Sequence, residues 1–149
     1  MNNNAGFTLL EVMITIAIFA VLSAIAIPNA IAWRNNSQFN AAVREVKSAI
    51  EGARMAAIRT NLPADIVFNG DNTFTARTRR IVAGAPVVGT PVNHQLSEAI
   101  TITWNNGAQL TFNNRGMPPA GGDGTVTIQH ANGRSNRITV SIVGSSWIL

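Results

Sequence analysis

Residues 6–28 read GFTLLEVMITIAIFAVLSAIAIP, and this stretch decides the architecture of the chain. The twenty-one residues from Phe7 to Ile27 would form a helix about 31 Å long, which matches the thickness of a hydrocarbon core. Four polar side chains interrupt the apolar run: Thr8, Glu11, Thr15 and Ser23. A secretory signal peptide is the first alternative, but a charged n-region is missing and no small-x-small cleavage site clearly follows. We therefore predict a retained membrane-spanning helix.

Glu11 is the informative residue of this segment. A carboxylate about four residues into a membrane helix costs a few kcal/mol unless it is paired or protonated. Taken alone, the segment leaves two interpretations evenly weighted: Glu11 reaches water at the nearby interface, or it meets a charge supplied by another chain. Charge bias does not settle the orientation. Residues 1–6 carry no Lys or Arg while Arg34 and Arg44 follow the helix, which by itself weakly favours a cytoplasmic C-terminal part.

The composition of the 149 residues excludes several classes of protein. Hydrophobic residues make up 46% and charged residues 12%, which is too apolar for a disordered chain. The absence of cysteine excludes a disulfide framework, a thiolate zinc site and a cysteine nucleophile. The net charge is +4, and ten of the eleven basic residues are arginine. This charge permits binding to an anionic partner without demanding it.

An amphipathic helix is predicted to continue the membrane segment. Apolar residues recur after Pro28 at spacings of four and three: Phe39, Val43, Val46, Ile50, Ala53 and Ala57. Helix-forming residues continue to about Arg59, and Asn61-Leu62-Pro63 stops them. One side of this second half must therefore pack on another element.

Beyond Pro63 the pattern favours an antiparallel β-sheet. Apolar and polar residues alternate in several short runs, and the apolar members are Ile100, Ile102, Trp104, Leu110, Phe112, Val126, Ile128, Ile138, Val140 and Ile142. Two further strand-like runs, 66–68 and 73–75, flank Asn69-Gly70. Asn-Gly steps at 69–70, 106–107 and 132–133 predict three hairpins. The Gly- and Pro-rich stretches 83–91 and 117–124 read as loops. The expected fold is α+β, with a long N-terminal helix packed on an antiparallel β-sheet head.

Gly6-Phe7-Thr8-Leu9-Leu10-Glu11 and the apolar run behind it resemble the N-terminal signal of type IV pilins and type II secretion pseudopilins. The resemblance implies that a prepilin peptidase cuts between Gly6 and Phe7 and methylates the new amine of Phe7. It also implies that Glu11 pairs with the terminal amine of a neighbouring subunit, which would relieve the desolvation cost of both charges. Pro28 matches the position at which helices of the family kink or locally melt. On this resemblance the C-terminal part lies outside the cytoplasm.

The C-terminal half narrows the resemblance to GspH/FimT-type minor pseudopilins. The stretches that carry it are Leu110–Gly116, Gly124–Ile128, Arg137–Val140 and Gly144. The expected division is a leader 1–6, a transmembrane and assembly helix 7–28, an amphipathic continuation 29–61 and a β-rich head 62–149. We expect no metal, because the calcium loop of major pseudopilins is not evident, and no cofactor.

Sequence motifs for catalysis are missing. His94 and His130 each stand alone, without ligand spacing to a second histidine or carboxylate. Gly84 and Gly89 have the spacing of a phosphate-binding loop, but Thr-Pro follows Gly89 and the lysine that the motif needs is missing. No G-x-S-x-G nucleophile elbow occurs, and the acidic residues beyond the helix are scattered. We expect that the protein is not an enzyme.

Two groups of arginines are the remaining candidates for binding. Arg77 and Arg79 would share one face of a strand, and Gly133-Arg134-Ser-Asn-Arg137 lies at the last hairpin turn. The second group resembles the Gly-Arg-x-Arg element through which some FimT-like minor pilins are thought to bind DNA, with one residue more between the arginines. A solvated rim that keeps the protein soluble is the favoured interpretation, and phosphate binding is the alternative. No aromatic residue interleaves with either group in the sequence, which disfavours stacking on single strands.

The expected function is that of a minor pilin or pseudopilin, a tip or priming subunit of a type IV pilus or type II secretion pseudopilus. The expected partners are other pilin subunits, a prepilin peptidase, an inner-membrane assembly platform and the membrane itself, with DNA as a further possibility. The expected location is the bacterial inner membrane, as a single-pass protein with a periplasmic head, and then a filament. Two rivals remain: a DNA receptor for natural transformation, and an unprocessed single-span membrane protein with a periplasmic binding head.

Overall fold

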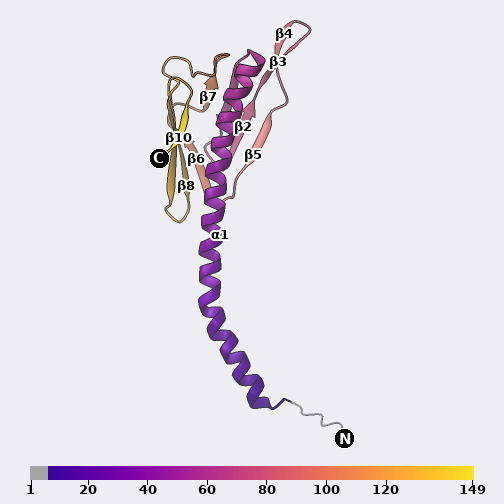
Figure 1. Cartoon of the computed structure of the whole chain (residues 1–149), viewed down its shortest axis with the longest axis vertical. Coiled ribbons are helices and arrows are strands. Elements are labelled where there is room, and N and C mark those ends of the chain that lie inside the picture. Colours follow the sequence, from indigo (N-terminus) through magenta and orange to yellow (C-terminus); the bar gives the residue numbers. More distant parts are fainter. Residues whose placement is uncertain (1–6) are drawn as a thin grey trace. The chain divides into compact units, whose positions relative to one another are not determined.

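The computed structural model describes residues 7–149, which form one helix and ten strands (Figure 1). The helix is α1 (Leu9–Thr60), and the strands are β1 (Ala64–Phe68), β2 (Thr73–Arg77), β3 (Arg79–Val82), β4 (Ala85–Val88), β5 (Val92–Gln95), β6 (Ile100–Trp104), β7 (Gln109–Phe112), β8 (Gly124–His130), β9 (Ser135–Val140) and β10 (Ser146–Ile148). The chain divides into two units, one ending at Ser37 and the other spanning Gln38–Leu149. Each unit is described by itself.

Helix α1 runs without interruption for 52 residues. It continues through Pro28, whose ring removes one backbone donor. It ends at Thr60, and Asn61 then takes a positive φ of 54°, so the predicted stop at 61–63 is confirmed. By length and composition, α1 is the one helix in residues 7–149 that could cross a membrane.

The strands of the second unit form two four-stranded antiparallel sheets and a separate hairpin. The first sheet has the order β5-β2-β1-β7, the second has the order β10-β9-β8-β6, and β3 pairs only with β4. Hairpins at Asn69-Gly70 and Asn132-Gly133 join β1 to β2 and β8 to β9, as the Asn-Gly steps predict.

One hydrophobic core joins the helix and both sheets. The six residues of the predicted helical stripe are all buried in it: Phe39, Val43, Val46, Ile50, Ala53 and Ala57. The first sheet contributes Ile66, Phe74 and Phe112, and the second contributes Ile102, Ile128 and Ile138. Burial of alternate residues in β6 follows the sequence pattern, with Ile100, Ile102 and Trp104 facing inward. The expected α+β fold is confirmed.

The predicted hairpin at Asn106-Gly107 is wrong. Strand β6 pairs with β8 and strand β7 pairs with β1, so the intervening turn carries the chain from one sheet to the other. The asparagine side chains explain the difference. The side chain of Asn105 accepts a hydrogen bond from the backbone of Thr125 at 2.7 Å, and that of Asn106 donates to the carbonyl of Asp123 at 3.1 Å. The turn is therefore tied to the start of β8.

Two further expectations are corrected by local turn geometry. The stretch 83–91 is not wholly a loop, because Ala83 and Gly84 both have positive φ and form a two-residue turn between β3 and β4. Ile142 does not extend β9. Ser141 and Ser145 close a turn in which their side-chain hydroxyls lie 2.7 Å apart, and Ile142 is left exposed.

Candidate assembly and binding surfaces

The N-terminal end of α1 carries the first candidate site. The hydroxyl of Thr8 accepts a hydrogen bond from the backbone N–H of Glu11 at 3.2 Å, which makes Thr8 the N-cap and places Glu11 in the first turn. Negative charge is favoured at this end of a helix because the free N–H groups carry partial positive charge. The sequence signal for this cap is the pattern T-x-x-E at residues 8–11. Gly6 lies outside the described residues.

The surface of α1 that follows Glu11 is apolar on every side. Its exposed large side chains include Val12, Ile14, Ile18, Phe19, Leu22, Ile25 and Ile31. The hydroxyl of Thr15 donates back to the carbonyl oxygens of Glu11 and Val12, at 2.9 and 2.8 Å. The hydroxyl of Thr15 is therefore satisfied within the helix, which suits an apolar environment. A surface of this kind is stable only in lipid or against other apolar helices.

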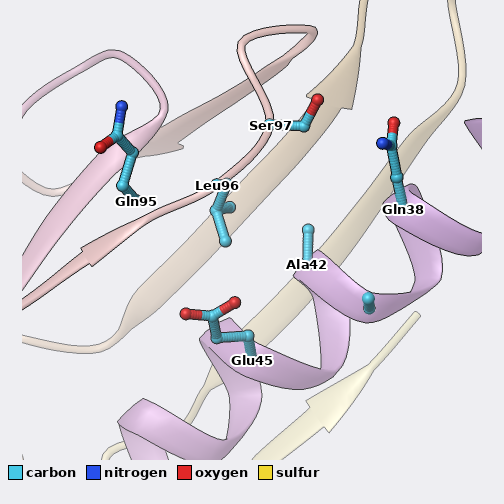
Figure 2. A pocket seen from close by; sticks show the side chains of 7 residues that line it. Gln38, Ala42, Glu45, Gln95, Leu96 and Ser97 are labelled. Atoms are coloured by element: carbon cyan, nitrogen blue, oxygen red, sulfur yellow. The ribbon is translucent and has the colours of Figure 1, made fainter.

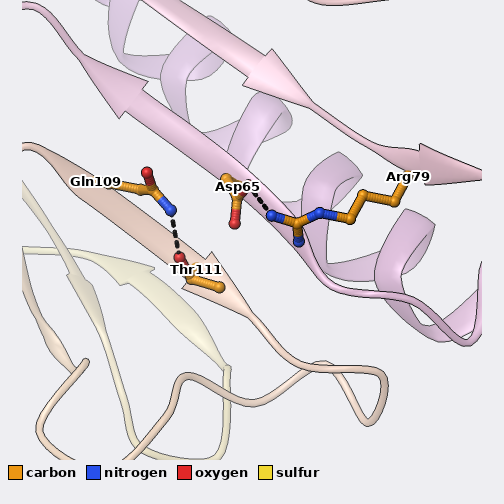
Figure 3. A network of polar contacts seen from close by, with 4 residues as sticks. All are labelled: Asp65, Arg79, Gln109 and Thr111. Carbon is orange, nitrogen blue, oxygen red and sulfur yellow. Dashed lines mark hydrogen bonds and ion pairs between the residues drawn. The ribbon is translucent and has the colours of Figure 1, made fainter. Parts of the chain in front are cut away.

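The structure gives Arg79 a structural partner. Its guanidinium Nη2 lies 3.0 Å from Oδ2 of Asp65, and only 5% of the Asp65 side chain is exposed (Figure 3). The same view shows Gln109 donating to Thr111 on the neighbouring strand β7, at 2.8 Å. Arg77, at the end of β2, is in register with Asp65 on β1 and is half-buried. Arg79 thus compensates a buried carboxylate, which favours a structural role over phosphate binding at this position.

The two arginines at the last hairpin turn, Arg134 and Arg137, lie in different environments. The guanidinium carbon of Arg134 lies 5.5 Å from the centroid of the Phe39 ring on α1, within the range of a cation–π contact. Arg137 is exposed on β9. Strand β10 pairs with β9 so that Trp147 faces Thr139, and side chains two residues apart on a strand share a face. The sheet therefore brings the indole of Trp147 to the face that carries Arg137, although no aromatic residue is near Arg137 in the sequence.

The two histidines have partners of different kinds. Nδ1 of His94 on β5 lies 2.9 Å from a carboxylate oxygen of Glu45 on α1, and its ring stacks on Phe74 with centroids 4.5 Å apart. His130 is buried at the end of β8, and its Nδ1 accepts a hydrogen bond from the backbone N–H of Asn132. Among residues 7–149, no group of three or more His, Asp or Glu side chains is placed to hold a metal ion.

A shallow groove of about 490 Å³ lies beside the His94–Glu45 contact (Figure 2). Gln38, Ala42 and Glu45 on α1 face the segment Gln95–Ser97, which begins at the last residue of β5. Its lining mixes amide, carboxylate and hydroxyl groups with Leu96 and two alanines. The groove offers hydrogen-bonding groups and one carboxylate, without the nucleophile–base pair that hydrolytic chemistry needs.

Comparison with protein families and curated proteins agrees with this architecture. The prokaryotic N-terminal methylation motif matches residues 1–27, and the type II transport protein GspH family matches residues 42–144. The type IV wide pilus major component PilA4 of Thermus thermophilus is 38% identical over 61 residues, which are 41% of this chain. The match spans about half the length of that relative, at 47%.

Two crystal structures of the type IV minor pilin FimU from Pseudomonas aeruginosa share the fold. One matches with a TM-score of 0.63 and 16% identity over 78% of this chain and 92% of that chain. The other has a TM-score of 0.58 and 18% identity over 74% and 91% of the two chains. The fold and the N-terminal segment thus define a pilin-like subunit. The chain belongs to the type II transport protein GspH family and carries the N-terminal methylation motif of prepilins.

Membership of this family confirms two expectations. Pilins are structural subunits, so the protein is not an enzyme. The apolar first half of α1 is the N-terminal hydrophobic helix of a prepilin.

Proposed function

We propose that the chain is a minor pilin or pseudopilin that serves as a tip or priming subunit of a type IV pilus or type II secretion pseudopilus. The precursor is cut between Gly6 and Phe7, and Phe7 receives the methyl group. Before assembly the subunit is stored in the bacterial inner membrane as a single-pass protein with a periplasmic head. After assembly it lies in a periplasmic pseudopilus or a surface pilus, having passed through the inner-membrane assembly platform.

The proposed division of the chain follows from this function. Residues 1–6 are the leader, 7–28 the transmembrane and assembly helix, 29–61 its amphipathic continuation and 62–149 the head. Pro28 marks the boundary at which the helix can kink or locally melt when subunits pack, because it lacks a backbone donor. The minor-pilin assignment draws support from the likeness of the fold to FimU, which is described as a minor pilin.

The observation that carries the proposal is the position of Glu11. It is the one acidic side chain in an otherwise apolar helix surface, and it stands in the first turn, four residues from the proposed new N-terminus at Phe7. A terminal ammonium of a neighbouring subunit would neutralise it as both enter an apolar helix bundle. The attraction between the two charges grows as water is excluded, and each charge removes the desolvation cost of the other.

N-terminal sequencing and intact mass of the mature protein, purified from a host with a pilin assembly system, test this proposal. We expect a chain that begins at Phe7 and carries one additional methyl group. A chain that retains Met1 would support the rival of an unprocessed membrane protein with a periplasmic binding head, and would contradict the proposal.

DNA binding during natural transformation is the second candidate function, and the face shared by Arg137 and Trp147 favours it. An exposed guanidinium and an exposed indole on the same face of the sheet would combine phosphate recognition with a surface on which a base can stack. Arg77, Arg79 and Arg134 contribute less to this candidate, because Arg79 pairs with Asp65, Arg77 is half-buried and Arg134 lies over Phe39.

A further inference from the structure

Beyond Pro28 and the polar Asn29, α1 carries a further apolar stretch, residues 30–33, which ends at Trp33. Ile31 and Trp33 are exposed, with Trp33 at 74%, and they follow the apolar run 7–27 without a break in the helix. Arg34 comes next, and the four residues after it, 35–38, are Asn, Asn, Ser and Gln. The change from apolar to polar surface therefore falls at residues 33–34, five residues beyond the proline.

Tryptophan and arginine are suited to the boundary between hydrocarbon and water. An indole is apolar over most of its surface but has one N–H donor, so it settles at the level of the lipid headgroups. An arginine can lay its aliphatic stem along the apolar surface and hold its guanidinium against lipid phosphates. Trp33 and Arg34 combine both properties at the end of one apolar surface.

We propose that Trp33 and Arg34 anchor the stored subunit in the lipid headgroup region on the side of the head. The bilayer boundary of α1 then lies at residue 33 rather than at Pro28. This inference rests on the proposed storage of the subunit in a membrane.

The length of α1 supports this placement. The helix rises about 33 Å from Glu11 to Trp33, close to the roughly 30 Å of a hydrocarbon core. Glu11 and Trp33 therefore stand at the two boundaries of the same bilayer. The carboxylate of Glu11 reaches the opposite headgroup region during storage, and it enters an apolar environment only when a neighbouring amine is there to pair with it.

A bilayer boundary at Pro28 would instead leave the side chains that follow the proline exposed to water. Ile31 and Trp33 would then stand in water on a helix with no other surface of its own unit to cover them, since the whole segment 9–33 is exposed. Ile31 distinguishes the two placements, because it lies between the two possible boundaries.

The lack of native cysteine allows the boundary to be mapped on the full-length chain. The precursor is reconstituted in vesicles of phosphatidylethanolamine and phosphatidylglycerol, with single variants Ile27→Cys, Ile31→Cys and Asn35→Cys, and treated with a membrane-impermeant maleimide. We expect labelling at positions 27 and 31 to be at least about tenfold slower than at 35. Labelling at 31 as fast as at 35, with 27 still protected, would place the boundary at Pro28 and overturn the inference.

The anchoring role is tested in the Ile31→Cys background. Trp33→Ala should speed labelling at position 31 several-fold because the helix loses its fixed depth, whereas Trp33→Tyr should leave it unchanged because tyrosine also favours the interface. Equal labelling in all three chains would overturn the anchor. Flotation of the precursor with the vesicles distinguishes failure of the anchor from failure of the proposed function. A precursor that floats but shows equal labelling contradicts only the anchor, whereas a precursor that does not float contradicts membrane storage itself.

Discussion

The hydroxyl of Thr8 accepts a hydrogen bond from the backbone N–H of Glu11 at 3.2 Å, so the N-cap of α1 is bonded directly to the backbone of its first acidic residue. The cap fixes where the helix begins, and with it the height of the Glu11 carboxylate along the helix axis. An assembly contact made by Glu11 would therefore fix the position of this helix along the axis of its neighbour. In a bundle of such helices, a shift of one residue would move the carboxylate by about 1.5 Å along the axis and away from its partner.

Gly144 is expected to tolerate no side chain. Its φ is +80°, and a Cβ atom there would overlap the carbonyl oxygen of Gly116 and approach Nε of Arg54. Arg54 donates to the same carbonyl at 3.1 Å, so the backbone cannot move away without losing that bond. Gly144→Ala should lower the free energy of unfolding of a soluble fragment 35–149 by about 2–4 kcal/mol, measured by urea denaturation.

Gly133 supplies the matched control for this substitution. It also has a positive φ, +90°, but a Cβ atom there would meet nothing within 4 Å. Gly133→Ala should cost only about 1–2 kcal/mol, the backbone strain alone. Equal losses for the two variants would show that the contact between the turns at 116 and 144 is not the cause.

Arg79→Ala should destabilise the head by leaving Asp65 without its partner. The carboxylate is buried and, within residues 7–149, its other oxygen Oδ1 has no hydrogen-bond partner, so no second group replaces the guanidinium. We expect a loss of about 2–4 kcal/mol in the free energy of unfolding. Arg80→Ala removes the same charge from an exposed position on β3 and should stay within about 0.5 kcal/mol of the parent. A loss for Arg80→Ala equal to that for Arg79→Ala would contradict the ion-pair account.

Asp71 introduces an acid-dependent contribution to stability. The hydroxyl and backbone N–H of Thr73 both donate to its carboxylate, at 2.7 and 2.6 Å, and these bonds lower the pKa of Asp71 in the folded state. Because the pKa of Asp71 is lower in the folded than in the unfolded chain, its ionised carboxylate stabilises the fold above the unfolded pKa of about 4. This stabilisation is lost as the pH falls through the pKa of Asp71 in the folded state. Asp71→Asn should flatten the dependence of thermal stability on pH below about 4. An unchanged dependence would show that other carboxylates control it.

Arg137 is the most direct test of the DNA-binding candidate. If the face it shares with Trp147 binds duplex DNA, the fragment 35–149 should bind with an affinity that falls as salt rises, and Arg137→Ala should reduce the salt slope by about one. Arg80→Ala is the control, because it removes an exposed arginine from another part of the head. The combination Arg134→Ala/Arg137→Ala also removes the contact with Phe39, so its folding must be checked by circular dichroism. No binding at low salt would leave these arginines as surface charge.

The sequence predicted those elements whose signals are local. The buried helical stripe from Phe39 to Ala57 and the hairpins at Asn69-Gly70 and Asn132-Gly133 follow from side-chain periodicity and turn chemistry. The turn at Asn106-Gly107 carries the same dipeptide, but the pairing of the strands on either side of it is set by contacts between residues distant in sequence. Asn106 bonds the carbonyl of Asp123, and no local pattern reveals such a partner.

The candidate site was predictable to a similar extent. Glu11 and the apolar helix can be recognised in the N-terminal sequence. The ion pair between Arg79 and Asp65 cannot, because the sequence around Arg79 does not reveal which strand lies beside this residue. The approach of Trp147 to the face of Arg137 likewise depends on the pairing of β10 with β9. Both relationships arise from sheet register, which the hydrophobic pattern of one strand cannot fix by itself.

The proposed assembly mechanism depends on the carboxylate of Glu11, and Glu11→Gln is the variant that isolates this group. The amide keeps the size of the side chain and the backbone cap to Thr8 but removes the charge. The control is Glu98→Gln, which removes an exposed charge from the head. The measurement is the amount of each variant in sheared filaments relative to its amount in the inner membrane, with the thermal stability of the head recorded for both. We expect Glu11→Gln to lower incorporation by about tenfold or more at unchanged head stability, and Glu98→Gln to match the parent. Incorporation of Glu11→Gln at the level of the parent would contradict the claim that this carboxylate directs assembly.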